Sequence, residues 1–228
     1  MFDFQEGEVL LIDKPLDWTS FQVVNKIRYA IRQKLGVKKI KVGHAGTLDP
    51  LATGLLILCT GKKTKTIDQI QAQEKEYTGI IKLGATTPSF DLETEVDQTF
   101  DTSGLTKGIV QKAAVRLTGD LDQIPPSFSA KKINGQRAYD LARKGELVEI
   151  PPKPVKVYEF ETNCADLLNI EFKIKCSKGT YIRSIARDLG LETSTGGHLT
   201  RLRRTKIGDF NVSDALTIEQ MIEVINQG

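Results

Sequence analysis

Apolar residues along the chain follow a strand-like spacing in some segments and a helical spacing in others. Short apolar or alternating runs predict strands at residues 9–12, 37–42, 55–58, 76–83, 155–163 and 167–176. Helical spacing predicts helices at residues 20–34, 62–71, 109–117, 182–189 and 218–225. Strands occur in hairpin-like pairs as well as with helices between them. The pattern therefore predicts an α+β domain with a mixed, largely antiparallel sheet flanked by helices.

The first helix has the clearest boundaries. Thr19 or Ser20 can cap its start, and Gly36 is expected to end it. The apolar positions of this helix recur at helical spacing and are expected to form its buried stripe: Phe21, Val24, Ile27, Ile31 and Leu35. The basic residues then occupy its other face.

One segment differs in character from the rest of the chain. Proline pairs at 125–126 and 151–152 enclose residues 123–154, which carry the basic stretch SAKKINGQR and a short helical pattern around residues 139–144. Proline pairs interrupt regular structure, so the segment is either an excursion from the main fold or a plain pair of turns. We expect the whole chain, residues 1–228, to form a single domain with this insertion.

Basic residues are clustered although the net charge is only +3. Residues 18–48 contain seven lysines and arginines and no acid. Further basic clusters lie at residues 62–65, 131–137 and 201–206. Any one cluster is typical of a solvated surface, but four clusters together favour a face that binds a polyanion such as a nucleic acid.

Cysteine and histidine are too few and too dispersed for a metal site. The three cysteines are widely spaced without a CxxC pair, and only His44 and His198 could join them. Cys59 and Cys176 end apolar runs and are expected to be buried. The first residues lack the pattern of a signal peptide, and no apolar run is long enough to cross a membrane. We therefore expect a cytoplasmic protein with no metal and no membrane association.

The stretch KVGHAGTLDPLATGLLILC, residues 41–59, contains a lone acid among small residues. Gly43, Gly46 and Gly54 can adopt unusual backbone angles or allow a partner to approach closely. Pro50 disfavours a helical backbone at Asp49. The composition suits either a turn with a capping aspartate or a loop that presents one carboxylate into a groove.

Six motifs in order resemble the tRNA pseudouridine-55 synthase (TruB-type) family of pseudouridine synthases. They are LIDKP, GHAGTLDPLATGLL, KEYTGIIKLG, IPPSFSAKKINGQRAYDLARKG, CSKGTYIRSIARDLG and LTRLRRTKIGDF, and together they cover nearly the whole chain. The resemblance implies the pseudouridine synthase fold and an isomerase that converts uridine in RNA to pseudouridine without a cofactor. The family also commonly carries a PUA domain after the catalytic domain, and we expect that domain to be absent here.

The resemblance implies three catalytic residues. Asp49 matches the catalytic aspartate, which acts as nucleophile or base. Tyr77 matches the tyrosine that packs on the target base, and Arg183 matches the arginine that pairs with the catalytic carboxylate. An adjacent arginine favours the ionised form of a carboxylate, so this pairing makes physical sense. Pattern alone favours a core residue at Tyr77 and a solvated one at Arg183, and only their occurrence together with the Asp49 loop points to a site.

The resemblance also implies substrate-binding residues. His44 matches a histidine beside the extruded nucleotide, and Lys14, followed by Pro15, matches a motif that flanks the cleft. Leu202 matches an apolar wall residue and Asp91 a polar residue near the arginine.

The expected partner is the T-arm stem-loop of tRNA, bound by a monomer. We expect residues 123–154 to form a mobile segment that clamps the RNA backbone through Lys131, Lys132 and Arg137. The basic face at residues 26–41 is expected to contact further phosphates.

Two other functions fit parts of the pattern. A non-catalytic RNA-binding protein would use the same basic surface, although the complete set of Asp49, Tyr77 and Arg183 argues against binding alone. A retaining glycosidase could be built on Asp49 and Asp91. The basic surface argues against it, as does Trp18, the only tryptophan available to stack on a sugar.

Overall fold

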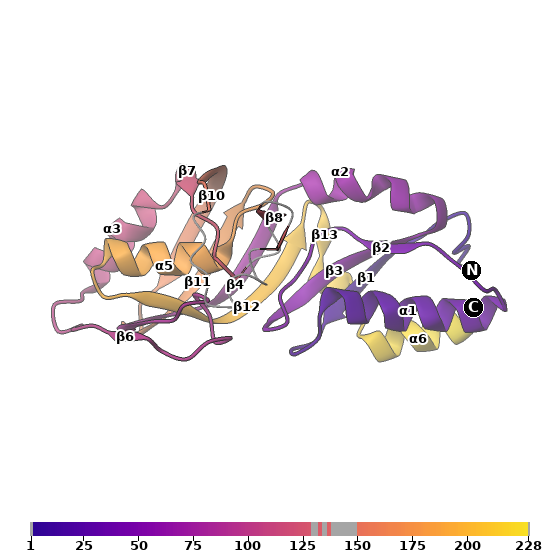
Figure 1. Cartoon of the computed structure of the whole chain (residues 1–228), viewed down its shortest axis with the longest axis horizontal. Helices are drawn as coiled ribbons and strands as arrows, with labels where there is room; N and C mark the ends of the chain where they lie inside the picture. Colours follow the sequence, from indigo (N-terminus) through magenta and orange to yellow (C-terminus); the bar gives the residue numbers. More distant parts are fainter. Residues whose placement is uncertain (1, 129–131, 134–135, 138–149, 228) are drawn as a thin grey trace. The chain divides into compact units, whose positions relative to one another are not determined.

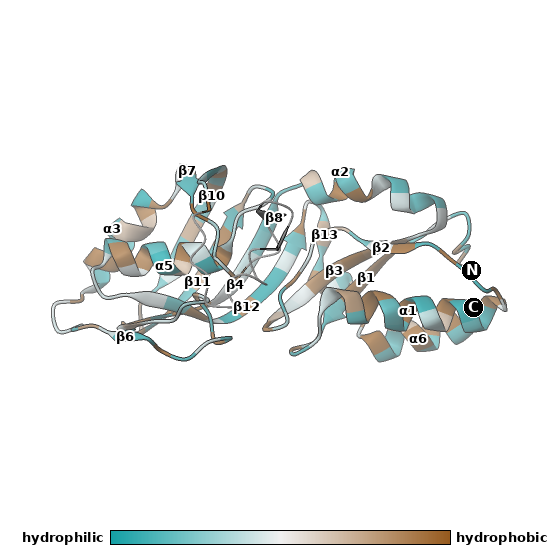
Figure 2. Ribbon diagram, viewed as in Figure 1, coloured by the Kyte–Doolittle hydropathy of each residue, from teal (hydrophilic) through white to brown (hydrophobic). Residues whose placement is uncertain are grey.

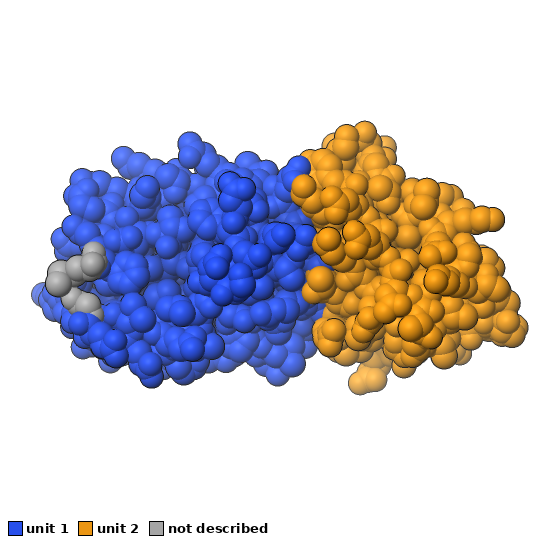
Figure 3. Space-filling model, turned by 180° about the vertical axis from the view of Figure 1, so that it is seen from behind, with its two compact units in different colours: residues 1–77, 202–228 blue, residues 78–201 orange. Residues whose placement is uncertain are grey.

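The computed structural model describes residues 2–128, 132–133, 136–137 and 150–227. Figure 1 shows its helices and strands, and Figure 3 shows the two compact units into which the chain divides. The first unit comprises Met1–Tyr77 and Leu202–Gly228, and the second comprises Thr78–Arg201. Strands β4 (Lys75–Leu83) and β12 (Gly197–Ile207) have residues in both.

The first unit is built around strand β3. Its elements are β1 (Val9–Lys14), α1 (Ser20–Leu35), β2 (Val42–His44), β3 (Ala52–Thr60), the 3-10 helix η1 (Gly61–Thr66), α2 (Ile67–Ala72), β13 (Phe210–Asn211), η2 (Val212–Asp214) and α6 (Ile218–Gln227). β1 pairs antiparallel with β3 along one edge. On the other edge, β12 pairs in parallel with the start of β3, and β2 pairs antiparallel with its end.

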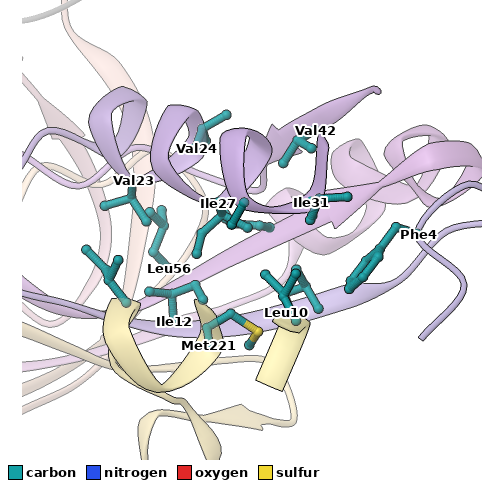
Figure 4. Packing of buried hydrophobic residues seen from close by; sticks show 14 residues of the cluster. Phe4, Leu10, Ile12, Val23, Val24, Ile27, Ile31, Val42, Leu56 and Met221 are labelled. Carbon is teal, nitrogen blue, oxygen red and sulfur yellow. The ribbon is translucent and has the colours of Figure 1, made fainter. Parts of the chain in front are cut away.

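Both faces of β3 are covered, which explains its continuous apolar sequence. Leu56 and Leu58 pack with β1, α1 and α6 on one face, and Figure 4 shows Ile12 and Leu56 between Ile27 of α1 and Met221 of α6. Successive residues of a strand point to opposite faces. The alternate residues of β3 accordingly join Ile70 of α2 in a second cluster. Figure 2 shows β1 and β3 as largely hydrophobic and α1 as mixed.

Helix α1 begins and ends where the sequence predicts, but its buried face differs. Thr19 is the N-cap, in a capping box with Gln22, and Gly36 ends the helix with φ of 64°. Val24, Ile27 and Ile31 are buried as predicted, together with Val23 and Ala30. Burial of Phe21 and Leu35 was a wrong prediction, because their side chains are 64% and 38% exposed. Phe21 is six residues before Ile27, so it lies about 120° away around the helix.

The second unit holds the rest of the sheet, in the order β12, β4, β11, β10, β7. β10 (Lys153–Asn163) pairs antiparallel with both β11 (Asn169–Cys176) and β7 (Gly119–Gln123). The helices among the described residues of this unit are α3 (Lys107–Arg116) and α5 (Ile182–Glu192), which contact each other. The remaining strands form two short hairpins, β5 (Ala85–Thr86) with β6 (Gln98–Thr99), and β8 (Lys132–Ile133) with β9 (Gln136–Arg137).

The predicted α+β class and the mixed, largely antiparallel sheet are confirmed. Cys59 and Cys176 are buried, as predicted. Two element predictions were wrong in part. The strand predicted at residues 37–42 begins only at Val42, and residues 62–71 form a 3-10 helix followed by a short α-helix. None of the described helices is long and apolar enough to cross a membrane.

Candidate functional site

Asp49 lies in a loop that crosses a gap on one edge of β3. β2 bonds to β3 from Leu58 onward, and β12 bonds to β3 up to Gly54. The residues from Ala45 to Leu51 lie between these two paired stretches. Asp49 is half-buried, and its carbonyl accepts a hydrogen bond of 3.1 Å from the Ala52 amide as β3 begins. This bond closes a turn over residues 49–52, so Asp49 stands at the first position of a turn at the end of the loop.

Helix α1 anchors the loop through Ser20. Its Oγ accepts a hydrogen bond of 2.9 Å from the Leu48 amide and donates one of 3.0 Å to the Leu48 carbonyl. The Asp17 amide donates to the Pro50 carbonyl at 3.0 Å. Both backbone groups of Leu48 and the carbonyl of Pro50 are thus fixed on either side of Asp49.

Strand β12 anchors the loop through Arg204, which is 1% exposed. Its guanidinium donates to the carbonyls of Leu55 at 2.8 Å, Gly46 at 3.0 Å and Thr47 at 3.3 Å. It thereby bonds a β3 carbonyl within the gap between β2 and β12. Gly54 is required here, because its φ is +101° and a Cβ would lie 2.3 Å from the Arg204 carbonyl.

The burial of Arg204 corrects the interpretation of the cluster at residues 201–206 as an RNA-facing surface. Its neighbour Arg203 is also engaged, in two hydrogen bonds of 2.9 and 2.7 Å with the carboxylate of Asp13. Sequence reasoning missed Arg204 and Ser20 as loop anchors. The only signal was the pair of arginines in the LTRLRRTKIGDF motif.

Strand β1 contributes Lys14, whose side chain is fully buried. Its Nζ donates to the carbonyls of Trp18 at 2.6 Å, Pro15 at 2.9 Å and Pro50 at 3.3 Å. Burial lowers the pKa of Lys14 to about 8, against the opposing attraction of Asp49 and Asp17. The structure therefore brings Lys14 and Asp49 close enough to interact electrostatically.

His44 ends β2 and leads into the loop. Its Nδ1 is buried, and no described atom meets the geometry of a hydrogen bond with it. Burial, followed by the positive charge of Arg204, lowers the pKa of His44, and the Gly46 backbone opposes this only in part. The imidazole is therefore neutral at pH 7.

Tyr77 and Leu202 are both nearly buried, with exposures of 9% and 8%. Tyr77 belongs to β4, in which buried positions alternate with more exposed ones. Leu202 belongs to β12 and is paired with Ala52, three residues after Asp49. Leu202 is therefore placed beside the loop, and its role as an apolar wall stays a prediction.

The second unit contains the predicted pair of Arg183 and Asp91. Arg183 lies in the first turn of α5; its Nε is 3.6 Å from Oδ2 of Asp91, and its Nη1 donates to the Ser89 carbonyl at 3.4 Å. Both side chains are buried, with exposures of 4% and 6%, so the alternative of a solvated arginine was wrong. Thr87 fixes the Asp91 backbone by donating to its carbonyl at 2.7 Å.

The predicted site residues thus form two groups, each within one unit. Lys14, His44, Asp49 and Leu202 gather at the loop, and Arg183 lies beside Asp91. The pairing of Asp49 with Arg183 and the role of Tyr77 stay predictions. Of the proposed RNA-backbone residues, Lys131 lies outside the described residues. Lys132 and Arg137 are paired in the β8–β9 hairpin, and only their backbones are described.

Comparison with known proteins decides the family. Residues 32–182 match the family described as TruB family pseudouridylate synthase (N terminal domain). The chain belongs to the TruB family. Residues 183–227 match the tRNA pseudouridylate synthase B C-terminal domain. The six-motif resemblance to the TruB family is thereby confirmed.

Relatives in this family match over nearly their whole length. The tRNA pseudouridine synthase B of Phocaeicola vulgatus is 56% identical over 225 residues, covering 99% of this chain and 96% of the relative. That of Flavobacterium johnsoniae is 54% identical over 217 residues, covering 95% of each chain. Among solved structures, a chain of the Cbf5-Nop10-Gar1 complex matches the fold of this chain with a TM-score of 0.69 and 26% sequence identity. The match covers 96% of this chain and 54% of that one, so this chain spans about half its length.

Proposed function

We propose that this chain isomerises uridine-55 in the T-loop of tRNA to pseudouridine, with Asp49 as its catalytic residue. The supporting observation is identity above 50%, over nearly the whole length, to proteins named tRNA pseudouridine synthase B. Identity of this extent supports a shared function, whereas a shared fold alone would leave the function open.

The reaction needs one well-held carboxylate. The bond between the sugar C1′ and N1 of the base breaks, the base rotates, and a bond forms between C1′ and C5, which gives up its proton to N1. Atoms and electrons balance without an oxidant or a hydrolytic water. Asp49 either attacks the sugar or removes a proton from it. The hydrogen bonds from Ser20, Lys14 and Arg204 to the loop backbone restrict where this carboxylate lies.

Tyr77 and Arg183 complete the proposed mechanism. A uridine in a folded RNA loop must be flipped out, which costs a few kcal/mol. Stacking of the base on Tyr77 would offset about 1–3 kcal/mol of this. Arg183, oriented by Asp91, would pair with Asp49 and favour its ionised form.

We also propose the expected substrate contacts and setting. The enzyme would act as a monomer in the cytoplasm and take the T-arm of tRNA. Residues 123–154 would hold the RNA backbone through Lys131, Lys132 and Arg137, and phosphate contacts of this kind position a substrate without reading its sequence.

Incubation with unmodified tRNA transcript tests the proposal. Pseudouridine at position 55, detected by chemical labelling because its mass equals that of uridine, is the expected product. Free uracil would instead indicate a glycosidase, and unchanged RNA would indicate a binding protein; either result would refute the proposal. Asp49→Asn should bind tRNA normally but isomerise it at least roughly 10³-fold more slowly than the parent. Asp17→Asn, an exposed acid beside the same loop, is the matched control and should retain activity.

A further inference from the structure

A basic groove lies in the first unit, between α1, the residues that follow it, and η1. It consists of two adjoining pockets of about 760 and 470 Å³ that share Lys39, Ile40, Lys41 and Thr64. We call it the α1–η1 groove. Its walls carry seven cationic side chains: Arg28, Arg32, Lys38, Lys39, Lys41, Lys62 and Lys65. No carboxylate is among the residues that line either pocket.

Most of these cations are not neutralised by the protein. Lys62 pairs with Glu6 at 2.7 Å, and Arg28 donates to the Val42 carbonyl at 3.1 Å. Within the described part of the chain, no carboxylate lies within ion-pair distance of Arg32, Lys38, Lys39 or Lys41. These four side chains are exposed and lie within a run of ten residues. Like charges at this density are stabilised when an anion occupies the groove.

The groove has fixed walls and an apolar floor. Arg28 ties α1 to Val42, and the Gly61 amide donates to the Lys41 carbonyl at 3.0 Å, which ties η1 to the same stretch. Ile40, Val42 and Ile67 line the groove between the cations. Such a surface fits a chain of phosphates linked by less polar sugars better than a small, uniformly charged ion.

The groove is remote from the candidate catalytic loop. Asp49 lies three residues before Ala52, where β3 begins, whereas the groove adjoins the paired residues Gly43 and Cys59 and the helix that follows Thr60. Ser20 of α1 bonds Leu48, next to Asp49, and Arg32 of the groove lies twelve residues further along α1, which separates the two places by roughly 18 Å at about 1.5 Å per residue. At about 3.4 Å per base-pair step, this distance corresponds to roughly five base pairs of a nucleic acid helix.

We propose that the α1–η1 groove binds the sugar-phosphate backbone of tRNA at a part of the molecule remote from the modified uridine. The inference rests on the proposed function, because it takes tRNA as the substrate whose uridine reaches Asp49. The groove then makes affinity depend on how far the RNA extends beyond the loop that is modified. A full tRNA reaches both places, whereas a short T-arm hairpin reaches only the catalytic loop.

The test compares these two RNAs with a variant that neutralises the groove. Lys38→Gln, Lys39→Gln and Lys41→Gln are combined, and Lys82→Gln, Lys107→Gln and Lys112→Gln form a control of equal charge change in the second unit. All six lysines are exposed, so thermal melting should be unchanged in both variants. For full tRNA, the groove variant should bind about 10–30-fold more weakly, with a salt dependence reduced by about three units of slope. Its affinity for the T-arm hairpin should stay within twofold of the parent.

Three results would overturn the inference. Unchanged tRNA affinity would leave the groove to another partner, such as an acidic protein. Equal losses for both RNAs would place the contact near the modified loop, and equal losses in the control variant would show a general charge effect. These are binding measurements, so they are separate from the proposed function, which fails only if the parent forms no pseudouridine in tRNA.

Discussion

Replacement of Arg204 by lysine tests whether the loop that carries Asp49 depends on a buried guanidinium. Lysine keeps the positive charge, so the electrostatic effect of residue 204 on Lys14 and His44 is largely retained. It lacks the planar set of donors that reaches three carbonyls. The substitution therefore removes geometry while leaving charge in place.

The expected magnitude follows from the contacts. Arg204 donates to Leu55, Gly46 and Thr47 at 2.8, 3.0 and 3.3 Å, and a single ammonium can reach about one of these carbonyls. A hydrogen bond from a charged donor is worth about 1.5–3 kcal/mol, and the longest contact is the weakest. Loss of one full bond and of the weak 3.3 Å contact to Thr47 should lower the free energy of unfolding by about 2–4 kcal/mol. For a chain of this size the midpoint of thermal unfolding should then fall by about 5–15 °C.

Catalysis should fall with the loosened loop. A displacement of about 1 Å in a reacting group can slow a reaction about 100-fold, so single-turnover isomerisation should be about 10–100-fold slower at saturating enzyme. Affinity for tRNA should change by less than about threefold, because Arg204 is buried away from phosphates. Arg203→Lys is the control, since its partly exposed pair with Asp13 is worth only about 0.2–1 kcal/mol. An Arg204→Lys protein that melts and turns over like the Arg203→Lys protein would refute the reasoning.

Three further predictions concern other parts of the site. Arg183→Lys should be severely impaired in single turnover although its charge is retained, because lysine cannot hold a carboxylate by two parallel bonds; near-normal turnover would contradict its proposed role. The pKa of Lys14 is about 8 in the folded protein and 10.5 in the unfolded chain. Between pH 8 and 10.5 the unfolded chain holds this proton and the folded protein does not, so the free energy of unfolding rises with pH. Denaturation at pH 7.5 and 10 should show a gain on the order of 2–3 kcal/mol that is absent in Lys14→Met. Neutralising the basic residues of the 123–154 segment should weaken tRNA binding and flatten its salt dependence, with less effect on turnover at saturating RNA, and an unchanged slope would exclude phosphate contacts. The residues to neutralise together are Lys131, Lys132 and Arg137.

Much of the fold could be predicted because its signals are local. The strands β10 and β11 alternate cleanly, and α1 has a capping box at Thr19 and a glycine at position 36. Where helical spacing left the buried face of a helix ambiguous, contacts with other elements determined which side chains are buried. Phe21 is apolar but exposed, since the face of α1 toward β1 and β3 is filled by Val23 and Ala30 as well as by the predicted residues.

The candidate site could be predicted only where a motif named the residue. Arg204 illustrates the limit, since in sequence it is one of several bases in a row and resembles a surface residue. It is buried because the Leu55 carbonyl of β3 and the Gly46 carbonyl of the loop are satisfied by a long side chain with several donors and not by a paired strand. This requirement arises from the meeting of strands distant in sequence, so no local pattern encodes it.

Because these strands bring charged side chains together at the loop, the pKa of Lys14 depends on the charges of Arg204 and Asp49. Lys14 and Arg204 are two buried cations that hold one loop, and the charge of Arg204 lowers the pKa of Lys14. Asp49 acts in the opposite direction, since it is the largest influence that raises the pKa of Lys14. Asp49→Asn removes that attraction, so the pKa of Lys14 should fall further below 8 in this variant. Its residual activity and its stability should therefore be measured near pH 6, where Lys14 stays charged and still holds the Pro50 carbonyl. A defect that persists at pH 6 then belongs to the carboxylate itself, whereas one that appears only above neutral pH belongs to the loop anchor.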